Sequence, residues 1–413
     1  MRKIVVVGGG PAGTFAAIAA KKHDSTAAVT LLTGEHCEPY EKPPLSKAVL
    51  LGRAAPADAP IAGPGGVAAH DVILETCARC SVIHRGARAI ELDNGRRVDY
   101  DALVLATGST PRQIPHLPIG MPGVHYLRTE ADAAALQAEL RGGRRLLVVG
   151  GGLIGLEVAA SAALVGVQVT VLEVAPRVLA RVCDEATGAA VHAAHTRHGV
   201  DIRLNTTVIA AVPQPDGPIV ATTASGDRFE ADLIVVGTGS KPDDALASSA
   251  GLATDDGVVV DAQCRTSDEA IFAAGDAVRF PGPSGLVRLE NWRHAQDQGM
   301  VAGKNAAGAS DTYASVPSFW SEQYDLYIQG VGWPVNGSTR VHRPIAGGGT
   351  IVFDVVDGRL AYAMGINAQR DLMVARRLIE RRATVDSSEL ADPQKPLQAM
   401  LKNPPRNHEH TKT

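Results

Sequence analysis

Residues 3–17, KIVVVGGGPAGTFAA, join an apolar strand to a helix through a glycine-rich turn. The β-branched run Ile4–Val7 predicts a buried parallel strand, and the alanine-rich segment Pro11–Lys22 predicts a helix. In the Gly-x-Gly-x-x-Gly pattern between them, the first glycine makes a tight turn, the second admits a phosphate and the third lets the helix pack on the strand. The positive end of the helix then faces the anion. The pattern predicts a pyrophosphate-binding loop formed by Gly8, Gly10, Pro11, Ala12 and Gly13.

The same pattern returns in the middle of the chain. Arg145–Glu173, RLLVVGGGLIGLEVAASAALVGVQVTVLE, again contains a strand, a glycine turn, a helix, a second strand and a terminal acid. Since every part has the spacing that a dinucleotide needs, this signal is stronger than the first. We expect a second pyrophosphate loop formed by Gly150, Gly152, Leu153, Ile154 and Gly155. The repeat indicates two dinucleotide sites in a duplicated α/β architecture.

An acidic residue follows each loop at the distance where a ribose hydroxyl is bound. Glu35 comes after the expected strand Ala28–Leu32, and Glu173 closes the second strand of the repeated unit. A carboxylate at the Glu173 position accepts from both ribose hydroxyls and repels a 2′-phosphate, which favours NADH over NADPH. Two alternatives stay open: Glu35 as a solvated loop residue, and Arg177 as a phosphate ligand.

Length and composition limit the class of protein. A chain of 413 residues is expected to form two or three domains. Its net charge of −4 gives no support to nucleic-acid binding. The most apolar region, Leu146–Val171, is interrupted by glycines and by Glu157, so we expect no membrane span. With no secretory signal and an odd number of cysteines, five in all, we expect a cytoplasmic protein.

Two other patterns do not predict a metal site. Cys77-x-x-Cys80 has no second cysteine pair to complete a zinc site, and we interpret it as two incidental thiols. His192, His195 and His198 recur in steps of three, whereas zinc helices use steps of four, so we expect an ordinary, partly exposed helix. The sequence therefore predicts a protein without a metal site.

The segment Tyr40–Lys47, YEKPPLSK, is a rigid loop because its two prolines fix the backbone. It resembles the YxRPPLSK signature of the FAD-dependent, NADH-using ferredoxin reductases that serve cytochromes P450 and Rieske-type oxygenases, with Lys42 where arginine is usual. Further matches extend over essentially the whole chain. They are the strand and turn Ala102–Gly108, the segment AIFAAGDA at 270–277, and the helix pattern that begins at Glu290.

The resemblance implies roles for residues in each matching motif. Lys47 is expected near flavin N5, Glu157 near the nicotinamide, and Trp320 over the edge of both rings. Because a buried carboxylate needs a partner, we predict an ion pair between Lys47 and Glu157. The resemblance also implies cofactor contacts from Lys42, Pro43, Ala106, Thr107, Gly108, Arg128, Val236, Gly237, Gly275, Asp276, Glu290, Asn291 and Trp292.

The expected fold class is α/β, with two Rossmann-like dinucleotide-binding domains as in glutathione reductase and a C-terminal α+β interface domain. The FAD-binding domain is expected to be discontinuous, because the flavin motifs lie on both sides of the second glycine loop. The expected boundaries are 1–112 and 241–316 for the FAD-binding domain, 113–240 for the NADH-binding domain and 317–413 for the interface domain.

The resemblance implies a reductase that passes electrons from NADH through FAD to a [2Fe–2S] ferredoxin. We expect a monomer or weak homodimer, with a basic ferredoxin-binding patch formed by Arg370, Arg376, Arg377, Arg381 and Arg382, unless these are the solvated face of a helix. One alternative is a flavin-dependent disulfide reductase or NADH oxidase. The disulfide reductase is disfavoured because Cys37 lacks a Cys-x4-Cys partner. Another alternative is a redox-signalling flavoprotein like apoptosis-inducing factor.

Overall fold

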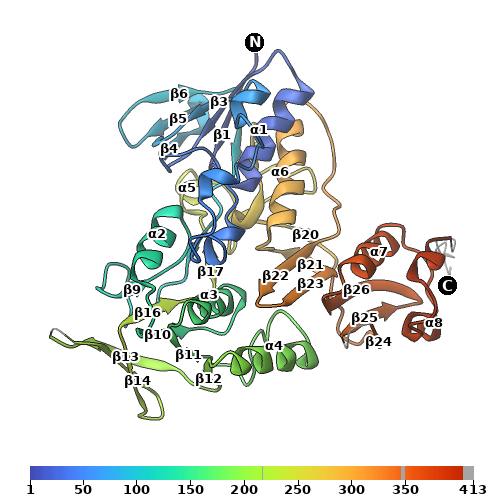
Figure 1. Ribbon diagram of the computed structural model, residues 1–413. Coiled ribbons are helices and arrows are strands. Elements are labelled where there is room, and N and C mark those ends of the chain that lie inside the picture. Colours follow the sequence, from blue (N-terminus) through green and yellow to red (C-terminus); the bar gives the residue numbers. More distant parts are fainter. Residues whose placement is uncertain (216, 346–348, 403–413) are drawn as a thin grey trace.

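The computed structural model describes residues 1–215, 217–345 and 349–402 (Figure 1), so 403–413 of the expected interface domain lie outside the described residues. Two parallel sheets and one antiparallel sheet form its framework. Among the described helices, none has the length and apolarity that crossing a bilayer requires.

The first parallel sheet contains the strand that precedes the first glycine loop. Its five strands follow the order β19-β7-β1-β2-β3. Their bounds are Ile271–Ala273 for β19, Ala102–Leu105 for β7, Lys3–Val7 for β1, Ala28–Leu32 for β2 and Ile73–Glu75 for β3. The chain therefore leaves this sheet after β7 and returns to it more than a hundred residues later, as the discontinuous arrangement of the flavin motifs predicts.

Helices α1 (Pro11–His23) and α6 (Trp292–Ala306) lie side by side on this sheet (Figure 1). Their close approach depends on two glycines of α6. A Cβ on Gly299 would lie 2.2 Å from the carbonyl oxygen of Ala12, and one on Gly303 would lie 2.0 Å from that of Ala16. These spacings leave no room for a side chain, so the packing fixes α1, and with it the glycine loop, against α6.

Replacing Gly303 by alanine is expected to force these helices apart. Overpacking of this kind costs about 1–3 kcal/mol, which urea unfolding followed by circular dichroism will measure. Gly86→Ala is the matched control, because no atom lies within 4 Å of a Cβ built there. Equal losses in both variants would contradict the packing argument.

The second parallel sheet repeats the arrangement in the order β12-β11-β10-β16-β9. The bounds of these strands are Asp201–Arg203, Gln168–Leu172, Arg145–Val149, Leu233–Val236 and Val124–His125. Helices α2 (Glu130–Glu139), α3 (Leu153–Leu164) and α4 (Glu185–Arg197) accompany it. An antiparallel meander, β13 (Val208–Pro213), β14 (Ile219–Thr223) and β15 (Arg228–Ala231), follows at its edge. Residues 201–203 thus lie in the parallel sheet and residues 208–213 in the meander.

A two-stranded ribbon connects the parallel sheets. Strand β8 (Ser109–Pro111) leads from the first sheet to the second, and β17 (Ser240–Pro242) returns antiparallel to it. The hydroxyl of Thr107 donates to the carbonyl of Asp243 at 2.6 Å, which ties the two crossings together.

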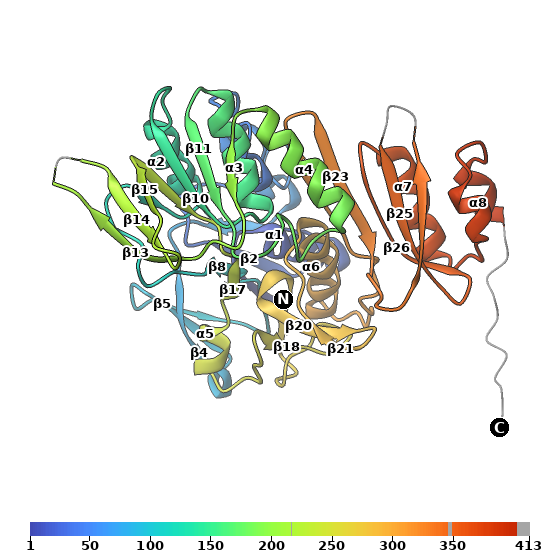
Figure 2. The same ribbon diagram turned by 90° about the horizontal axis from the view of Figure 1, so that it is seen from below.

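The C-terminal unit is an antiparallel sheet in the order β22-β23-β26-β25-β24. Its strands span Ser318–Gln323, Leu326–Gly332, Arg359–Ile366, Thr350–Val356 and Thr339–Pro344. Helix α7 (Gln369–Glu380) packs on it through Leu372, Ala375 and Leu378, and α8 (Ser387–Ala391) follows. Figure 2 shows most of this unit beside the two nucleotide-type sheets, with β23 reaching toward them. The predicted mixture of strands and helix is confirmed.

Smaller elements complete the described chain. Strands β4 (Cys80–His84), β5 (Ala89–Leu92) and β6 (Arg97–Asp99) form one antiparallel sheet, with the expected turn at Asn94-Gly95. Another sheet contains β18 (Val258–Val259), β20 (Val278–Gly282) and β21 (Gly285–Val287), and α5 (Ala245–Ser249) precedes it. Residues 54–68 contain the 3-10 helix Pro56–Asp58 and the start of another at Val67.

Candidate cofactor and redox site

A cavity of about 840 Å³ opens where the two parallel sheets and strand β22 meet. Residues expected to touch cofactor line it from four separate parts of the chain: Gly8, Gly10, Pro11, Ala12, Glu35, Lys42, Pro43, Lys47, Ala106, Thr107, Gly108, Arg128, Leu153, Ile154, Glu157, Asp276, Glu290, Asn291, Trp292 and Trp320. The fold therefore gathers most of the predicted site around one space large enough for a cofactor.

The first glycine loop presents an uncapped helix end to this cavity. Gly8 has φ +114°, a conformation that favours glycine, and Gly13 lies against the Gly8 carbonyl. Helix α1 begins after Gly10, which offers no side-chain cap, and no atom lies within 4 Å of a Cβ built there. By contrast, Thr129, Asp184 and Asn291 cap α2, α4 and α6 with their side chains. Open N–H groups beside a hollow fit a pyrophosphate.

The second glycine loop has the same geometry but lies outside this cavity. Gly150 has φ +113°, Gly155 packs against the Gly150 carbonyl, and α3 starts after Gly152 without a side-chain cap. The predicted residue Val236 ends the neighbouring strand β16, and Gly237, which follows it, packs against Gly155. This loop thus offers a second anion site, while α3 extends to the cavity through Leu153, Ile154 and Glu157.

The acid of the second unit lies beside its loop. Glu173 accepts from the N–H of Gly151 at 2.6 Å and from that of Ala175 at 2.8 Å. The guanidinium of Arg177 donates to the backbone carbonyls of Ala180 at 3.0 Å and Asp184 at 3.4 Å. Arg177 is thus held by the backbone carbonyls of Ala180 and Asp184, and Glu173 by the backbone N–H groups of Gly151 and Ala175.

Glu35 is tied to the proline-rich loop that follows the second strand of the first unit. Its carboxylate accepts from the Tyr40 hydroxyl at 2.6 Å and from the Lys42 ammonium at 2.9 Å. Burial favours a higher pKa for Glu35, but Lys42 and Tyr40 outweigh it and lower the pKa below its usual value. Lys42, which stands where the related signature has arginine, therefore braces Glu35 on the cavity wall.

Asp276 reaches the cavity from the turn that follows strand β19. It accepts from the Ser109 hydroxyl at 3.2 Å and lies 3.5 Å from the Arg128 guanidinium. Burial raises the pKa of Asp276, although Arg128 opposes this. Gly275, at φ +83°, does not line the cavity; its N–H donates to Gln298 of α6 at 2.8 Å. The turn thus places one acceptor where a polyhydroxyl chain could bind.

Glu157 joins three parts of the chain at the inner wall of the cavity. One oxygen accepts from the Lys47 ammonium at 2.9 Å and from the Ser46 hydroxyl. The other accepts from the Ser321 hydroxyl of β22 at 2.6 Å. Only 7% of the Glu157 side chain and 19% of the Lys47 side chain are exposed. The predicted Lys47–Glu157 ion pair is therefore present and largely buried.

The hydrogen bonds continue from Ser321 into helix α4. Gln323 donates to the Ser321 hydroxyl at 3.1 Å, and its carbonyl oxygen lies 2.9 Å from Nε2 of His195. His195 is fully buried, which lowers its pKa, whereas Arg197 of the same helix is exposed, so α4 is the partly exposed helix that the sequence predicts. The packing of β22 on α4 covers this face of the helix.

Aromatic rings border the same space. Trp320 of β22 and Trp292 of α6 contact each other edge to face, with ring centroids 6.3 Å apart. Both line the cavity together with Phe319. Trp320 is on the strand that also carries Ser321, so neighbouring side chains of β22 reach the cavity and the Glu157 carboxylate. Flat rings at an opening suit the stacking of a planar cofactor or substrate.

Several lining residues were missed from the sequence. Arg79, Cys80 and Ser81 reach the cavity from β4 and the loop before it, and Leu246 and Ser249 reach it from α5. None of these five residues belongs to a sequence motif that would mark it as a cavity residue. Ser46 stands inside the quoted stretch YEKPPLSK and Ser321 directly follows Trp320, so motif membership could have identified them.

Removal of one partner of the Lys47–Glu157 pair leaves a buried charge. Lys47→Met and Glu157→Gln are each expected to lower the free energy of unfolding by about 3 kcal/mol. The double variant is expected to lose at least about 1 kcal/mol less than the sum, as a double-mutant cycle in urea will show.

Lys395→Met is the control, because Lys395 and Glu389 are also 2.9 Å apart but exposed. The Lys395→Met substitution should have no measurable effect on the free energy of unfolding. Strict additivity of the Lys47 and Glu157 losses would show that the two charges do not interact.

Two dinucleotide-type sheets, each with an uncapped helix after a glycine loop, and a shared cavity define an oxidoreductase that brings two nucleotide cofactors together. Comparison with known proteins agrees. Residues 2–299 match the pyridine nucleotide-disulphide oxidoreductase family, and residues 318–401 match the reductase C-terminal family.

Relatives narrow the class. The chain is 41% identical to the ferredoxin–NAD(+) reductase component of the anthranilate 1,2-dioxygenase system of Burkholderia cepacia, covering 96% of this chain and 98% of that one. It is 38% identical to rhodocoxin reductase of Rhodococcus erythropolis, covering 94% and 92%. The chain belongs to the pyridine nucleotide-disulphide oxidoreductase family, among its ferredoxin–NAD(+) reductases, and is an FAD-dependent, NADH-using oxidoreductase.

Solved structures show the same fold. The reductase in a covalent putidaredoxin reductase–putidaredoxin complex superimposes with a TM-score of 0.90 at 32% identity, covering 97% of this chain and 98% of that one. An engineered water-forming NADPH oxidase, at 22% identity and a TM-score of 0.83, covers 94% and 93% and shares the fold alone.

Proposed function

We propose that this chain transfers a hydride from NADH to FAD and then passes electrons singly to a [2Fe–2S] ferredoxin that serves a cytochrome P450 or a Rieske-type oxygenase. The observation that carries the proposal is the shared cavity, where the first glycine loop, the start of α3 and the aromatic strand β22 converge. The relative from Burkholderia cepacia supports a ferredoxin as the acceptor, since it is the ferredoxin–NAD(+) reductase component of a dioxygenase system.

The residues divide between two cofactors. Residues 1–112 and 241–316 would hold FAD, with its pyrophosphate on the Gly8–Gly13 loop, a ribose near Glu35 and a ribityl chain near Asp276. Residues 113–240 would hold NADH, with its pyrophosphate on the Gly150–Gly155 loop and its ribose on Glu173. Residues 317–413 would form the interface domain. Bound flavin supplies the conversion between a two-electron donor and a one-electron acceptor.

The protein positions the reacting rings. The Lys47 ammonium, fixed by Glu157, would face the N5 edge of the flavin with a hydrogen-bond donor. Trp320 would cover the nicotinamide and exclude water. Because Glu157 lies on the same helix that starts at the second glycine loop, one rigid element connects the NADH pyrophosphate to the reacting end.

The ferredoxin would bind at a basic surface. Arg370 near the start of α7 and Arg377, Arg381 and Arg382 near its end are exposed, and Met373 of the same helix is 56% exposed. Arg376 is already paired, 3.7 Å from Asp297 of α6 and 2.8 Å from Glu380, so it would contribute less. A cationic surface would steer an acidic partner. We place the reaction in the cytoplasm, with a monomer or weak homodimer as the working form.

A flavin-dependent disulfide reductase remains the second candidate because it shares the fold. It needs a dithiol at the flavin, and Cys80 does line the cavity while Cys77 lies three residues before it. All five cysteines are free. The two candidates differ in the number of electrons that each chain takes up.

An anaerobic titration of the purified holoprotein with NADH separates them. We expect the flavin absorbance to bleach fully at about one NADH per flavin, because flavin is the only redox couple in the proposal. A [2Fe–2S] ferredoxin added afterwards should be reduced and restore the oxidised flavin spectrum. A requirement for about two NADH would indicate a dithiol couple and overturn the proposal.

A further inference from the structure

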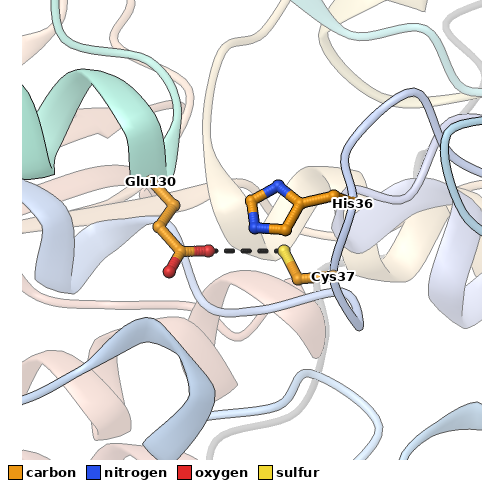
Figure 3. Close-up of side chains that lie close together, drawn as sticks. All are labelled: His36, Cys37 and Glu130. Atoms are coloured by element: carbon orange, nitrogen blue, oxygen red, sulfur yellow. Dashed lines mark hydrogen bonds between the residues drawn. The ribbon is translucent and has the colours of Figure 1, made fainter.

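Three metal-ligand types meet beside the cavity where the sequence predicts no metal site. His36 and Cys37 belong to the loop after β2, and Glu130 is the first residue of α2 (Figure 3). The Cys37 thiol donates to a Glu130 oxygen at 3.4 Å. An imidazole nitrogen, the sulfur and a carboxylate oxygen all lie within 4.8 Å of one another. Among the described residues, this is the group of three such side chains with that spacing.

The backbone on both sides of the cluster is held in place. The N–H of Cys77 donates to the Glu35 carbonyl at 2.9 Å, which fixes the loop just before His36. On the other side, Thr129 and Asp132 form a reciprocal cap at the start of α2. The N–H of Glu130 donates to the Tyr40 hydroxyl at 2.7 Å, which connects the two elements. The ligands are therefore presented by fixed segments instead of free loop ends.

The donor set selects a class of ion. A thiolate and an imidazole favour zinc and similar borderline cations over magnesium or calcium, and a thiolate with one carboxylate balances a double positive charge. Tetrahedral zinc with bonds of about 2.0–2.3 Å places ligand atoms roughly 3.3–3.8 Å apart. The three ligand atoms here lie within 4.8 Å of one another, so a bound ion would draw them closer together.

Solvent access and the fourth coordination position also fit a metal site. His36 is exposed, so an ion can enter from solvent, whereas Cys37 and Glu130 are half-buried. The nearby carboxylate of Glu35 is already bound by Tyr40 and Lys42, which leaves the fourth position to water.

We propose that His36, Cys37 and Glu130 bind a zinc-type divalent cation, which bridges the loop after β2 to the start of α2. The ion displaces the thiol proton and replaces the Cys37–Glu130 hydrogen bond by two metal–ligand bonds. Its ligand His36 directly follows Glu35, which lines the cavity. The ion therefore fixes the first parallel-sheet unit to the second at their junction.

The test is a Zn²⁺ titration of the holoprotein by calorimetry, after treatment with a chelator. We expect one ion per chain. Loss of a partner behind a metal ligand already weakens binding by about 10- to 100-fold, so Cys37→Ser and Glu130→Gln should each weaken it at least about tenfold. Cys77→Ser is the matched control, because its thiol is exposed and outside the cluster, and it should bind as the parent does. Unchanged affinity in Cys37→Ser would overturn the proposal.

A second measurement needs no variant. Alkylation of the parent holoprotein, followed by mass spectrometry, should show that Zn²⁺ protects Cys37 while Cys77 stays reactive. Absorption spectroscopy at the zinc edge should show one sulfur at about 2.3 Å and lighter ligands at about 2.0–2.1 Å. Equal alkylation of Cys37 with and without Zn²⁺, or coordination without sulfur, would contradict the site even if Cys37→Ser fails to fold.

Discussion

The carboxylate of Glu157 is the point on which the arrangement of the molecule depends. It is buried on α3 and accepts hydrogen bonds from Lys47 and Ser46 of the first unit and from Ser321 of β22. An ionised carboxylate only accepts hydrogen bonds, which matches three donors around it. Leaving a buried charge unpaired raises the free energy, and this cost opposes the separation of any of these units. The pair therefore fixes the relative positions of both glycine loops and the aromatic strand.

This constraint relates the fold to electron transfer. The first glycine loop is braced from behind by the contact of α1 with α6, and the second loop is continuous with α3. Both rigid elements lead to the same cavity, where Trp292 and Trp320 border the opening. Ser321, Gln323 and His195 extend the support of Glu157 into α4. Hydride transfer requires reacting atoms at close, fixed separation, and such a scaffold supplies it.

The sequence predicts the parts of this structure that local spacing encodes. Both glycine loops, their helices and the acid Glu173 follow from contiguous motifs, and the Lys47–Glu157 pair, 110 residues apart, follows from the family resemblance of two separate motifs. The remaining contacts join single polar residues far apart in the chain. His195 and Gln323 are 128 residues apart and Cys37 and Glu130 are 93 apart, and neither pair has a periodic pattern around it. Their burial is decided by how β22 meets α4 and how α2 meets the loop after β2, which only the folded chain reveals.

The most direct test of the central claim, that the junction at Glu157 holds nicotinamide against flavin in one orientation, is the stereochemistry of the transfer. The holoprotein would oxidise two preparations of NADH, each deuterated at one of the two C4 positions, and mass spectrometry would measure the deuterium left in NAD⁺. A fixed face predicts complete loss of deuterium from one preparation and complete retention in the other. Partial loss from both would mean that the nicotinamide is not held in a single orientation, and would contradict the account.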